Sequence, residues 1–231
     1  MTKHTESSHK ITLSLAFATP FYPMKNEIQL ALAQSCSYEV YRTVVKNQFL
    51  VGKVTGHEQS EAFLHYTELN EARMHRLDKT TSLTPETLDA ISQWDKKILW
   101  LVLTEGWCAD GAQVLPILNK MAQANLNIDL QLAFRDENDN LMQRVLTHGA
   151  KAMPKLLVID PENHILLGQW GPRPQGAVNL IANYKKEQGV VDETAKADLQ
   201  LWYFRDKGVE IQQEIVAIMH QVLSTSLQNQ E

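Results

Sequence analysis

The chain has 231 residues, 44% of them hydrophobic, and its 22 basic and 27 acidic residues give a net charge of −5. This length suffices for one buried core with additional elements around it. The mild acidity argues against a nucleic-acid or anionic-membrane binder, and no apolar run approaches the roughly 18 residues of a membrane span. The two cysteines, Cys36 and Cys108, exclude a disulfide framework and indicate a reducing, cytoplasmic compartment.

Residues 1–23 are expected to form a flexible leader before the folded chain. A basic start, a short apolar run from Ile11 and a cleavage-like stretch at 16–18 leave export open as an alternative. Glu6 and the brevity of the apolar run weaken that alternative, so we expect a cytoplasmic protein.

Regular hydrophobic periodicity begins after Met24, where apolar residues recur every four positions. This spacing keeps them on one helical face. The expected stripe comprises Ile28, Leu32, Cys36, Val40 and Val44. Cys36 is therefore interpreted as a small buried hydrophobe, and the alternative is a resolving thiol for Cys108.

Two more helices are expected before residue 97. Residues 57–79 predict a charged helix, and its core-facing residues would be Phe63, Tyr66, Leu69, Ala72 and Leu77. Residues 83–94 predict a short helix with Thr84 as N-cap and Pro85 in the first position. Residues 24–96 are thus predicted to be a helical N-terminal extension.

The pattern changes at residues 97–104, a continuous apolar run typical of a strand buried on both faces. The following segments alternate between helical and strand periodicity. They are a helix at 112–125, a strand at 128–134, a helix at 138–149 ending at Gly149, a hairpin at 155–170 turning at 161–163, and a helix at 174–189. The β-α-β-α-β-β-α order predicts an α/β domain over residues 97–188.

Residues 189–231 are expected to form C-terminal helices, at 192–207 and 209–223, separated by Gly208. The second carries an apolar stripe of Ile211, Ile215, Ile218 and Val222. We interpret the stripe as internal packing, and a partner surface remains an alternative.

The sequence Trp-Cys-Ala-Asp-Gly, residues 107–111, places a thiol where a strand leads into a helix. A cysteine there faces unpaired N–H groups and the positive end of the helix dipole, which favours the thiolate and predicts a Cys108 more acidic than a free thiol. The negative charge of Asp110 acts against this. The net direction of the Cys108 pKa is left open by these opposing effects.

Together with the element order, three local features resemble the thioredoxin superfamily, in particular bacterial thioredoxin-family proteins with additional helices. Residues 107–111 resemble the family's W-C-x-x-C loop, in an incomplete W-C-x-x-G form. Pro116 lies where relatives have a helix-kinking proline, and Gly149 to Asp160 resembles the segment with the family's cis-proline, here Pro154. The resemblance implies a three-layer thioredoxin-like fold with N- and C-terminal helical extensions.

The resemblance also indicates site residues. A cis Met153–Pro154 bond would leave the Met153 backbone free to pair with an extended peptide, and a trans bond is the alternative. Arg135 and Arg173 would lie on the Cys108 side, as an anion-attracting rim or as solvated surface charge. The residues so indicated are Cys108 as the catalytic thiol, Trp107, Met153 and Pro154 as substrate-binding residues, and Asp110, Gly111, Arg135 and Arg173 as motif neighbours.

Two departures from the family pattern restrict the chemistry. Gly111 occupies the position of the resolving cysteine, so a mixed disulfide at Cys108 has no neighbouring thiol to release it. Val102 stands where many thioredoxins have a buried acid that assists the second thiol. Dithiol oxidoreductase chemistry is therefore not expected.

No zinc-ligand spacing, phosphate loop or nucleophile elbow is present in the sequence, so no metal or cofactor is expected. The favoured hypothesis is a single-cysteine redox protein in which Cys108 forms mixed disulfides, with a protein or low-molecular-weight thiol as partner. The alternative is a non-catalytic thioredoxin-fold module that binds proteins or peptides. A third possibility is a sensor oxidised to sulfenic acid. Enzymatic turnover and oligomeric state are left open.

Overall fold

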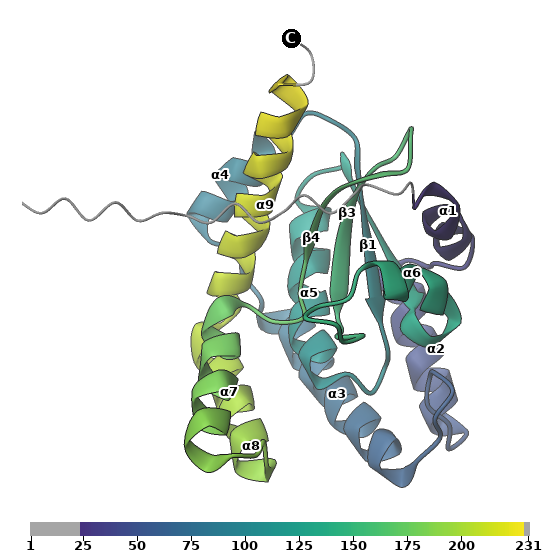
Figure 1. Ribbon diagram of the computed structural model, residues 1–231, viewed down its shortest axis with the longest axis vertical. Helices are drawn as coiled ribbons and strands as arrows, with labels where there is room; N and C mark the ends of the chain where they lie inside the picture. The colour runs from purple at the N-terminus through teal and green to yellow at the C-terminus, as the bar shows by residue number, and fades with distance from the viewer. Residues whose placement is uncertain (1–23, 229–231) are drawn as a thin grey trace, which may run out of the picture.

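The structure is a computed structural model that describes residues 24–228, so the expectations for residues 1–23 lie outside the described part (Figure 1). Its centre is a four-stranded sheet with strand order β2-β1-β3-β4. β1 pairs in parallel with β2, while β3 is antiparallel to both β1 and β4. The strands are β1 (Ile98–Thr104), β2 (Ile128–Phe134), β3 (Lys155–Asp160) and β4 (Ile165–Trp170).

Some helices connect these strands, and others are additional to the central domain. The connecting elements are α5 (Ala109–Gln123), the 3-10 turn η1 (Arg135–Asn138), α6 (Asp139–Arg144) and, after β4, α7 (Gln175–Gln188). The predicted β-α-β-α-β-β-α order is confirmed. The additional helices are α1 (Lys25–Ala33), α2 (Tyr38–Leu50), α3 (Glu61–Thr80), α4 (Pro85–Ser92), α8 (Glu193–Asp206) and α9 (Val209–Gln228).

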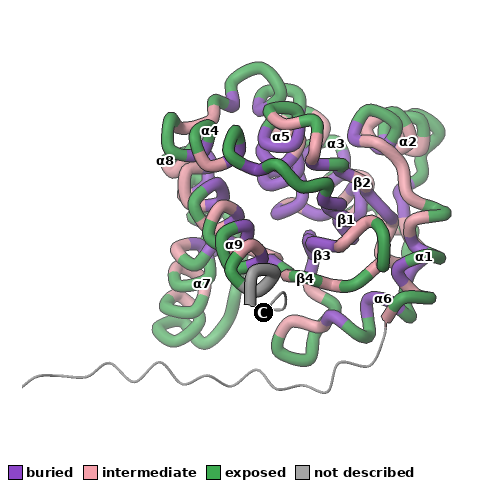
Figure 2. Tube along the Cα trace, turned by 90° about the horizontal axis from the view of Figure 1, so that it is seen from above, coloured by how far each residue is buried: buried purple, intermediate pink, exposed green. Residues whose placement is uncertain are grey.

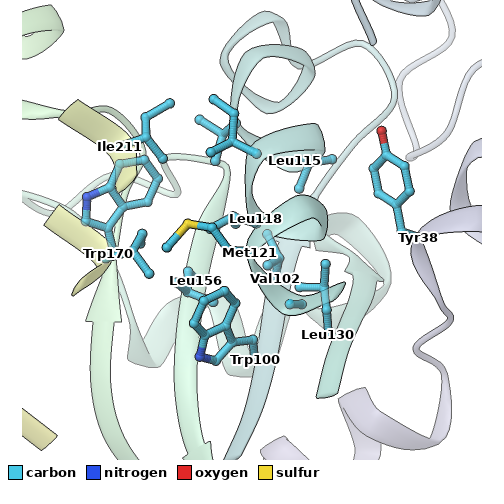
Figure 3. Packing of buried hydrophobic residues seen from close by; sticks show 14 of the residues in the cluster. Tyr38, Trp100, Val102, Leu115, Leu118, Met121, Leu130, Leu156, Trp170 and Ile211 are labelled. Atoms are coloured by element: carbon cyan, nitrogen blue, oxygen red, sulfur yellow. The ribbon is translucent and has the colours of Figure 1, made fainter. Parts of the chain in front are cut away.

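The sheet lies between two helical layers because successive side chains of a strand point to opposite faces. On one face Trp100 and Val102 pack with residues of α5 and α9 (Figure 3), and Met74 of α3 belongs to the same cluster. On the other face Leu101 packs with residues of α1 and α6. Figure 2 shows the buried residues running through the strands between these layers. The predicted three-layer arrangement with helical extensions is therefore confirmed.

The predicted helical stripe through Cys36 is wrong. α1 and α2 are separate helices, and Cys36 lies between them in an antiparallel bridge with Leu132 of β2, with N···O distances of 2.9 and 2.8 Å. The side chain of Ser37 then caps α2. Val40 is consequently 49% exposed. The helix is interrupted here by a backbone pairing with a distant strand, which hydrophobic periodicity cannot reveal.

The predicted core face of α3 is also wrong, apart from Leu77. The buried residues of α3 are Thr67, Asn70, Met74 and Leu77. Leu69 is 37% exposed, and Phe63 and Tyr66 are only half-buried. α3 packs on α5 through the face that carries both polar and apolar residues. Its aromatic face therefore does not face the core.

The helix expected to end at Gly149 ends at Arg144. Thr147 and Ala150 then exchange backbone hydrogen bonds of 2.9 and 3.0 Å. Between them His148 and Gly149 both have positive φ angles, as in a two-residue hairpin turn. Gly149 therefore serves a turn and is not a helix cap.

Other local predictions are confirmed. Thr84 caps α4, and Pro85 occupies its first position. The apolar stripe of α9 packs inside the molecule, with Ile211 and Ile215 fully buried. Among the described residues, no helix combines the length and apolar character needed to cross a membrane.

Candidate functional site

Cys108 is the N-cap of α5, and its side chain is only 7% exposed. Its Sγ accepts a hydrogen bond from the Gly111 N–H at 3.2 Å and donates to the Met153 carbonyl oxygen at 3.3 Å. The Met153–Pro154 peptide bond is cis. The loop before β3 thus meets the start of α5, as the sequence resemblance implied. The Met153 carbonyl oxygen accepts its hydrogen bond from the Cys108 thiol itself.

The environment of Cys108 favours the thiol over the thiolate. Burial, and next the negative charge of Asp110, raise the pKa of Cys108 to about 12. The Gly111 and Asp110 N–H groups and Arg173 act in the opposite direction without offsetting this. The net direction, which the sequence left open, is therefore upward, because desolvation outweighs the effect of the helix N-terminus.

Thr104 occupies the space beside Gly111, the resolving position. A Cβ added to Gly111 would lie 2.8 Å from Thr104 Oγ1 and 3.5 Å from Cys108 Sγ. Real Cβ atoms essentially never approach a neighbour as closely as 2.8 Å. A larger side chain at position 111 therefore requires a shift of Thr104.

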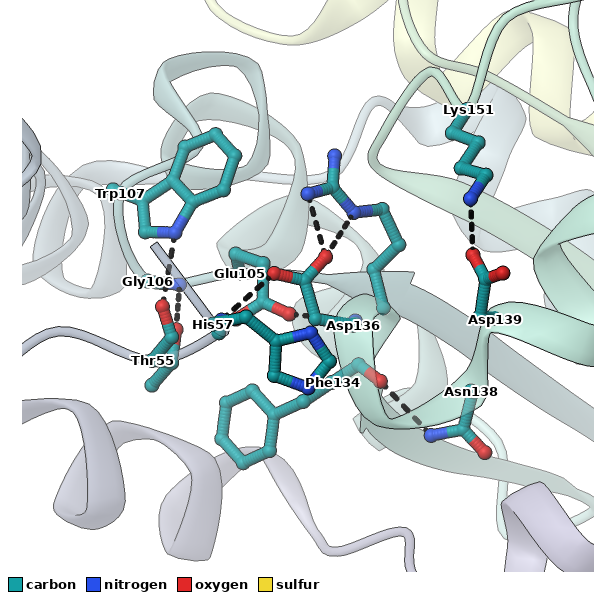
Figure 4. Close-up of polar contacts among 12 residues, drawn as sticks. Thr55, His57, Glu105, Gly106, Trp107, Phe134, Asp136, Asn138, Asp139 and Lys151 are labelled. Atoms are coloured by element: carbon teal, nitrogen blue, oxygen red, sulfur yellow. Dashed lines mark hydrogen bonds and ion pairs between the residues drawn. The ribbon is translucent and has the colours of Figure 1, made fainter. Parts of the chain in front are cut away.

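The loop before Cys108 is tied to the helical extension. Thr55 accepts the Gly106 N–H on Oγ1 at 2.8 Å and the Trp107 indole N–H on its carbonyl oxygen at 3.0 Å (Figure 4). Asn70 of α3, which is 1% exposed, donates to the Gly106 carbonyl oxygen at 2.9 Å. The Phe63 ring stacks on Trp107 with centroids 4.0 Å apart. The orientation of Trp107 is therefore fixed by residues outside the central domain.

Residues 135–138, whose role the sequence did not reveal, connect the same elements. Asp136 binds Arg135 through Oδ1 and accepts the His57 N–H on Oδ2 at 3.0 Å (Figure 4). Its own N–H donates to Glu105 Oε1 at 3.0 Å. Burial acts against ionisation of Asp136, but the hydrogen bonds from His57 and Arg135 lower its pKa overall. Arg135 also lies 5.2 Å from the Trp107 ring centroid.

Arg173 forms an ion pair with Asp110 beside Cys108. Both its Nε and a terminal nitrogen lie 2.8 Å from Asp110 Oδ2, while Asp110 Oδ1 accepts the Tyr203 O–H at 2.9 Å. Asp110 therefore joins α5, the loop after β4 and α8. Gly171 permits this path, because its φ is +112° and an added Cβ would lie 2.2 Å from the Pro154 carbonyl oxygen.

These elements line an open cavity of about 600 Å³ beside Cys108. We call Trp107, Cys108, Asp110 and Met153 its floor. The cavity-lining residues of α3 and α8 form its cover: Phe63, His65, Tyr66, Leu69 and Arg73 from α3, and Glu193, Lys196, Ala197, Leu199 and Gln200 from α8. Ala109, Arg135, Lys151 and Arg173 complete the lining. Gly111 and Pro154 are not among the lining residues.

Sequence reasoning identified the floor and missed the cover. The spacing of Phe63, Tyr66 and Arg73 places them on one helical face, which could have marked a site if that face had not been assigned to the core. Tyr203 gave no signal, because its partner Asp110 is distant in sequence. Among the described residues, no group of three or more His, Cys, Asp or Glu side chains could hold a metal ion.

Comparison with known proteins provides a family match and two similar folds. A family model described as thioredoxin matches residues 56–185. A protein of unknown function from Pseudomonas aeruginosa is 21% identical, with a TM-score of 0.51, and the match covers 80% of this chain and 98% of that one. An HIV epitope-scaffold is 20% identical, with a TM-score of 0.50 and the same coverage. No curated protein matches the chain. At such identities the two structures establish a shared fold alone.

Proposed function

Since this chain belongs to the thioredoxin superfamily, we propose that it is a thioredoxin-fold binding protein whose cavity above Cys108 holds a small ligand. In this proposal the thiol is part of the binding surface and does not exchange disulfides. The observation that carries the proposal is the burial of Cys108, 7% exposed, with its thiol hydrogen-bonded to Met153. This preference reverses the one drawn from sequence, where the single-thiol redox function was narrowly favoured.

The state of the thiol is the first support. Disulfide exchange requires attack by a thiolate. With the pKa of Cys108 raised to about 12 by burial and Asp110, on the order of one molecule in 10⁵ would be ionised at pH 7. The side chain already accepts from Gly111 and donates to Met153. An incoming disulfide would have to displace these contacts.

The accessibility of the floor is the second support. An extended peptide that pairs with the loop before β3 needs the Met153 backbone. The Met153 carbonyl oxygen already accepts the Cys108 thiol, and Met153 is buried. Residues of the cover line the same cavity as Met153. A ligand small enough to enter the cavity fits this arrangement better than a protein segment does.

Single-thiol redox chemistry is the second candidate function. It is favoured by one observation: Cys108 Sγ lines the cavity at a helix N-terminus and accepts the Gly111 N–H. A sulfenic acid sensor requires an exposed, acidic thiol, which the burial and the raised pKa of Cys108 disfavour.

The reactivity of Cys108 towards a small disulfide separates the two functions. The Cys36→Ser protein would be mixed with 4,4′-dithiodipyridine at pH 7, with N-acetylcysteine as reference and the protein lacking both cysteines as control. We expect Cys108 to react at least about 100-fold more slowly than the reference thiol, because it is neutral and buried. Unfolding in guanidinium should restore the ordinary rate. A folded protein that reacts faster than N-acetylcysteine would favour the redox function and overturn the proposal.

A further inference from the structure

Five lysine and arginine side chains of the described residues line the cavity, and four of them have an acidic partner. Arg173 pairs with Asp110, Arg135 with Asp136, Lys151 with Asp139 and Lys196 with Glu193. The fifth is Arg73 of α3, which forms no ion pair within the described part of the chain. Asp110 acts on it electrostatically, but that carboxylate is already engaged by Arg173 and Tyr203.

Arg73 is held in place despite lacking an acidic partner. One of its terminal nitrogens donates to Asn70 Oδ1 at 2.8 Å, and Asn70 donates in turn to the Gly106 carbonyl oxygen. The buried amide of Asn70 thus joins Arg73 to the loop that leads into Cys108. Burial lowers the pKa of Arg73, as expected for a cation that is partly removed from water without a counter-charge. An anion in the cavity would supply that charge.

Beside its polar residues His65, Glu193, Lys196 and Gln200, the cover presents apolar side chains to the cavity. Phe63, Tyr66 and Leu69 lie on the same face of α3 as Arg73, and Leu199 faces the cavity from α8. Phe63 is stacked on Trp107, which gives this wall a fixed aromatic surface. Ligand sites typically combine such apolar walls with a few oriented polar groups.

We propose that the cavity binds a small organic monocarboxylate with an apolar or aromatic body, and that Arg73 binds its carboxylate. A guanidinium group presents a planar pair of donors that matches a carboxylate, which gives orientation as well as affinity. The single cation without an ion-pair partner among the described residues matches one negative charge on the ligand, since each of the other four has its own acidic partner. This inference rests on the proposed binding function and names the class of ligand.

The test uses three probes that share one body and differ in charge: 3-phenylpropanoate, 3-phenylpropanamide and 3-phenylpropan-1-amine. Binding would be measured by calorimetry and by shifts of the Trp107 indole N–H and the Gly106 amide in nitrogen-15 spectra. We expect the carboxylate to bind at least about tenfold more tightly than the amide and the amine. Arg73→Gln should remove this preference and leave the affinity for the amide within about twofold.

Arg76→Gln is the matched control, because it removes the same charge from the same helix at a residue that is exposed and does not line the cavity. It should bind all three probes like the parent protein. Arg73→Lys keeps the charge and loses the paired donors, so its affinity should lie between those of the parent and Arg73→Gln. Thermal unfolding of each variant would verify that it is folded.

The outcomes separate this inference from the proposed function. Equal affinity for carboxylate and amide, unchanged by Arg73→Gln, would overturn the carboxylate assignment while leaving a binding cavity in place. If Arg76→Gln weakened carboxylate binding as much as Arg73→Gln does, the preference would reflect the overall charge of the helix. This result would also overturn the carboxylate assignment. Failure of all three probes to bind in the millimolar range would contradict the inference. The proposed function fails separately, through rapid reaction of Cys108 with 4,4′-dithiodipyridine.

Discussion

The floor and the cover of the cavity use their polar groups in opposite ways. On the floor, the Cys108 thiol is hydrogen-bonded on both sides, and Asp110 is shared between Arg173 and Tyr203. In the cover, Arg73 is oriented by Asn70 and forms no ion pair with a carboxylate of residues 24–228. The family's reactive position is thus internally satisfied, and the unsatisfied charge lies in a helix outside the central sheet. This contrast underlies our proposal that a residue of the helical extension, and not the thiol, binds the charged group of the ligand.

The largest loss of stability is expected from a substitution at Gly171, which lies against Pro154, next to Met153 of the floor. Gly171→Ala would place a Cβ 2.2 Å from the Pro154 carbonyl oxygen in a residue with φ of +112°. We expect a loss of roughly 2–5 kcal/mol in the free energy of unfolding, measured in urea. Gly52→Ala is the control, because Gly52 has a positive φ with nothing within 4 Å of the added Cβ. Its cost should be about 1–2 kcal/mol, and equal losses for the two variants would contradict the steric explanation.

The connection between floor and cover should weaken in Asp110→Asn. This change leaves Arg173, whose side chain is 30% exposed, without its counter-charge. We expect a loss of about 1–3 kcal/mol, less than for a fully buried pair because water reaches Arg173. The pKa of Cys108 should also fall, since Asp110 is the second cause that raises it. Tyr203→Phe removes only a neutral hydrogen bond to Asp110, so it should cost about 1 kcal/mol and leave the Cys108 pKa nearer its original value. A Cys108 pKa unchanged by Asp110→Asn would contradict this assignment.

Gly111→Ala tests the space beside the thiol. Helix propensity alone would make this change stabilising by up to about 1 kcal/mol. The contact with Thr104 Oγ1 at 2.8 Å should reverse the sign, to a net loss of about 1–2 kcal/mol. In a double-mutant cycle, Thr104→Ala should recover about 1 kcal/mol of the cost. Strict additivity of the two changes would show that Thr104 is not the obstacle.

The smallest of the four expected effects is that of Glu105→Gln on the pH dependence of stability. Burial raises the pKa of Glu105, which is 1% exposed. The folded state therefore holds this proton more tightly than the unfolded state, whose glutamates ionise near pH 4.3. As pH rises through that value towards the raised folded pKa, the parent protein should lose stability relative to Glu105→Gln. Urea unfolding of both proteins from pH 4 to 7 measures the difference, and parallel curves would contradict the prediction.

The sequence was sufficient for the central sheet and for most of the floor. Strand β1 is a continuous apolar run, which hydrophobic periodicity predicts well. The β3–β4 hairpin and the Thr84 cap of α4 follow from local residue types. The approach of Cys108 to Met153 was inferred from resemblance. The pKa of Cys108 could not be predicted, because the desolvation that dominates it arises from elements distant in the chain.

The cover was mispredicted for a physical reason. An apolar helical face is expected to face the core, and in α3 the aromatic face with Phe63 and Tyr66 lines the cavity instead. The core contact is made by a mixed face with Thr67, Asn70 and Met74. Asn70 is tolerated there because it hydrogen-bonds to Gly106, a partner that no local pattern reveals.

Titration of the Cys108 thiolate is the most direct test of the central claim, that this site binds without exchanging disulfides. The absorbance of the thiolate near 240 nm would be followed against pH in the Cys36→Ser protein, with the protein lacking both cysteines as blank and circular dichroism to monitor folding. The structure predicts a pKa of about 12, so the folded protein should show no thiolate at neutral pH. A pKa below the value of about 8.5 for a free thiol, in the folded protein, would contradict the account.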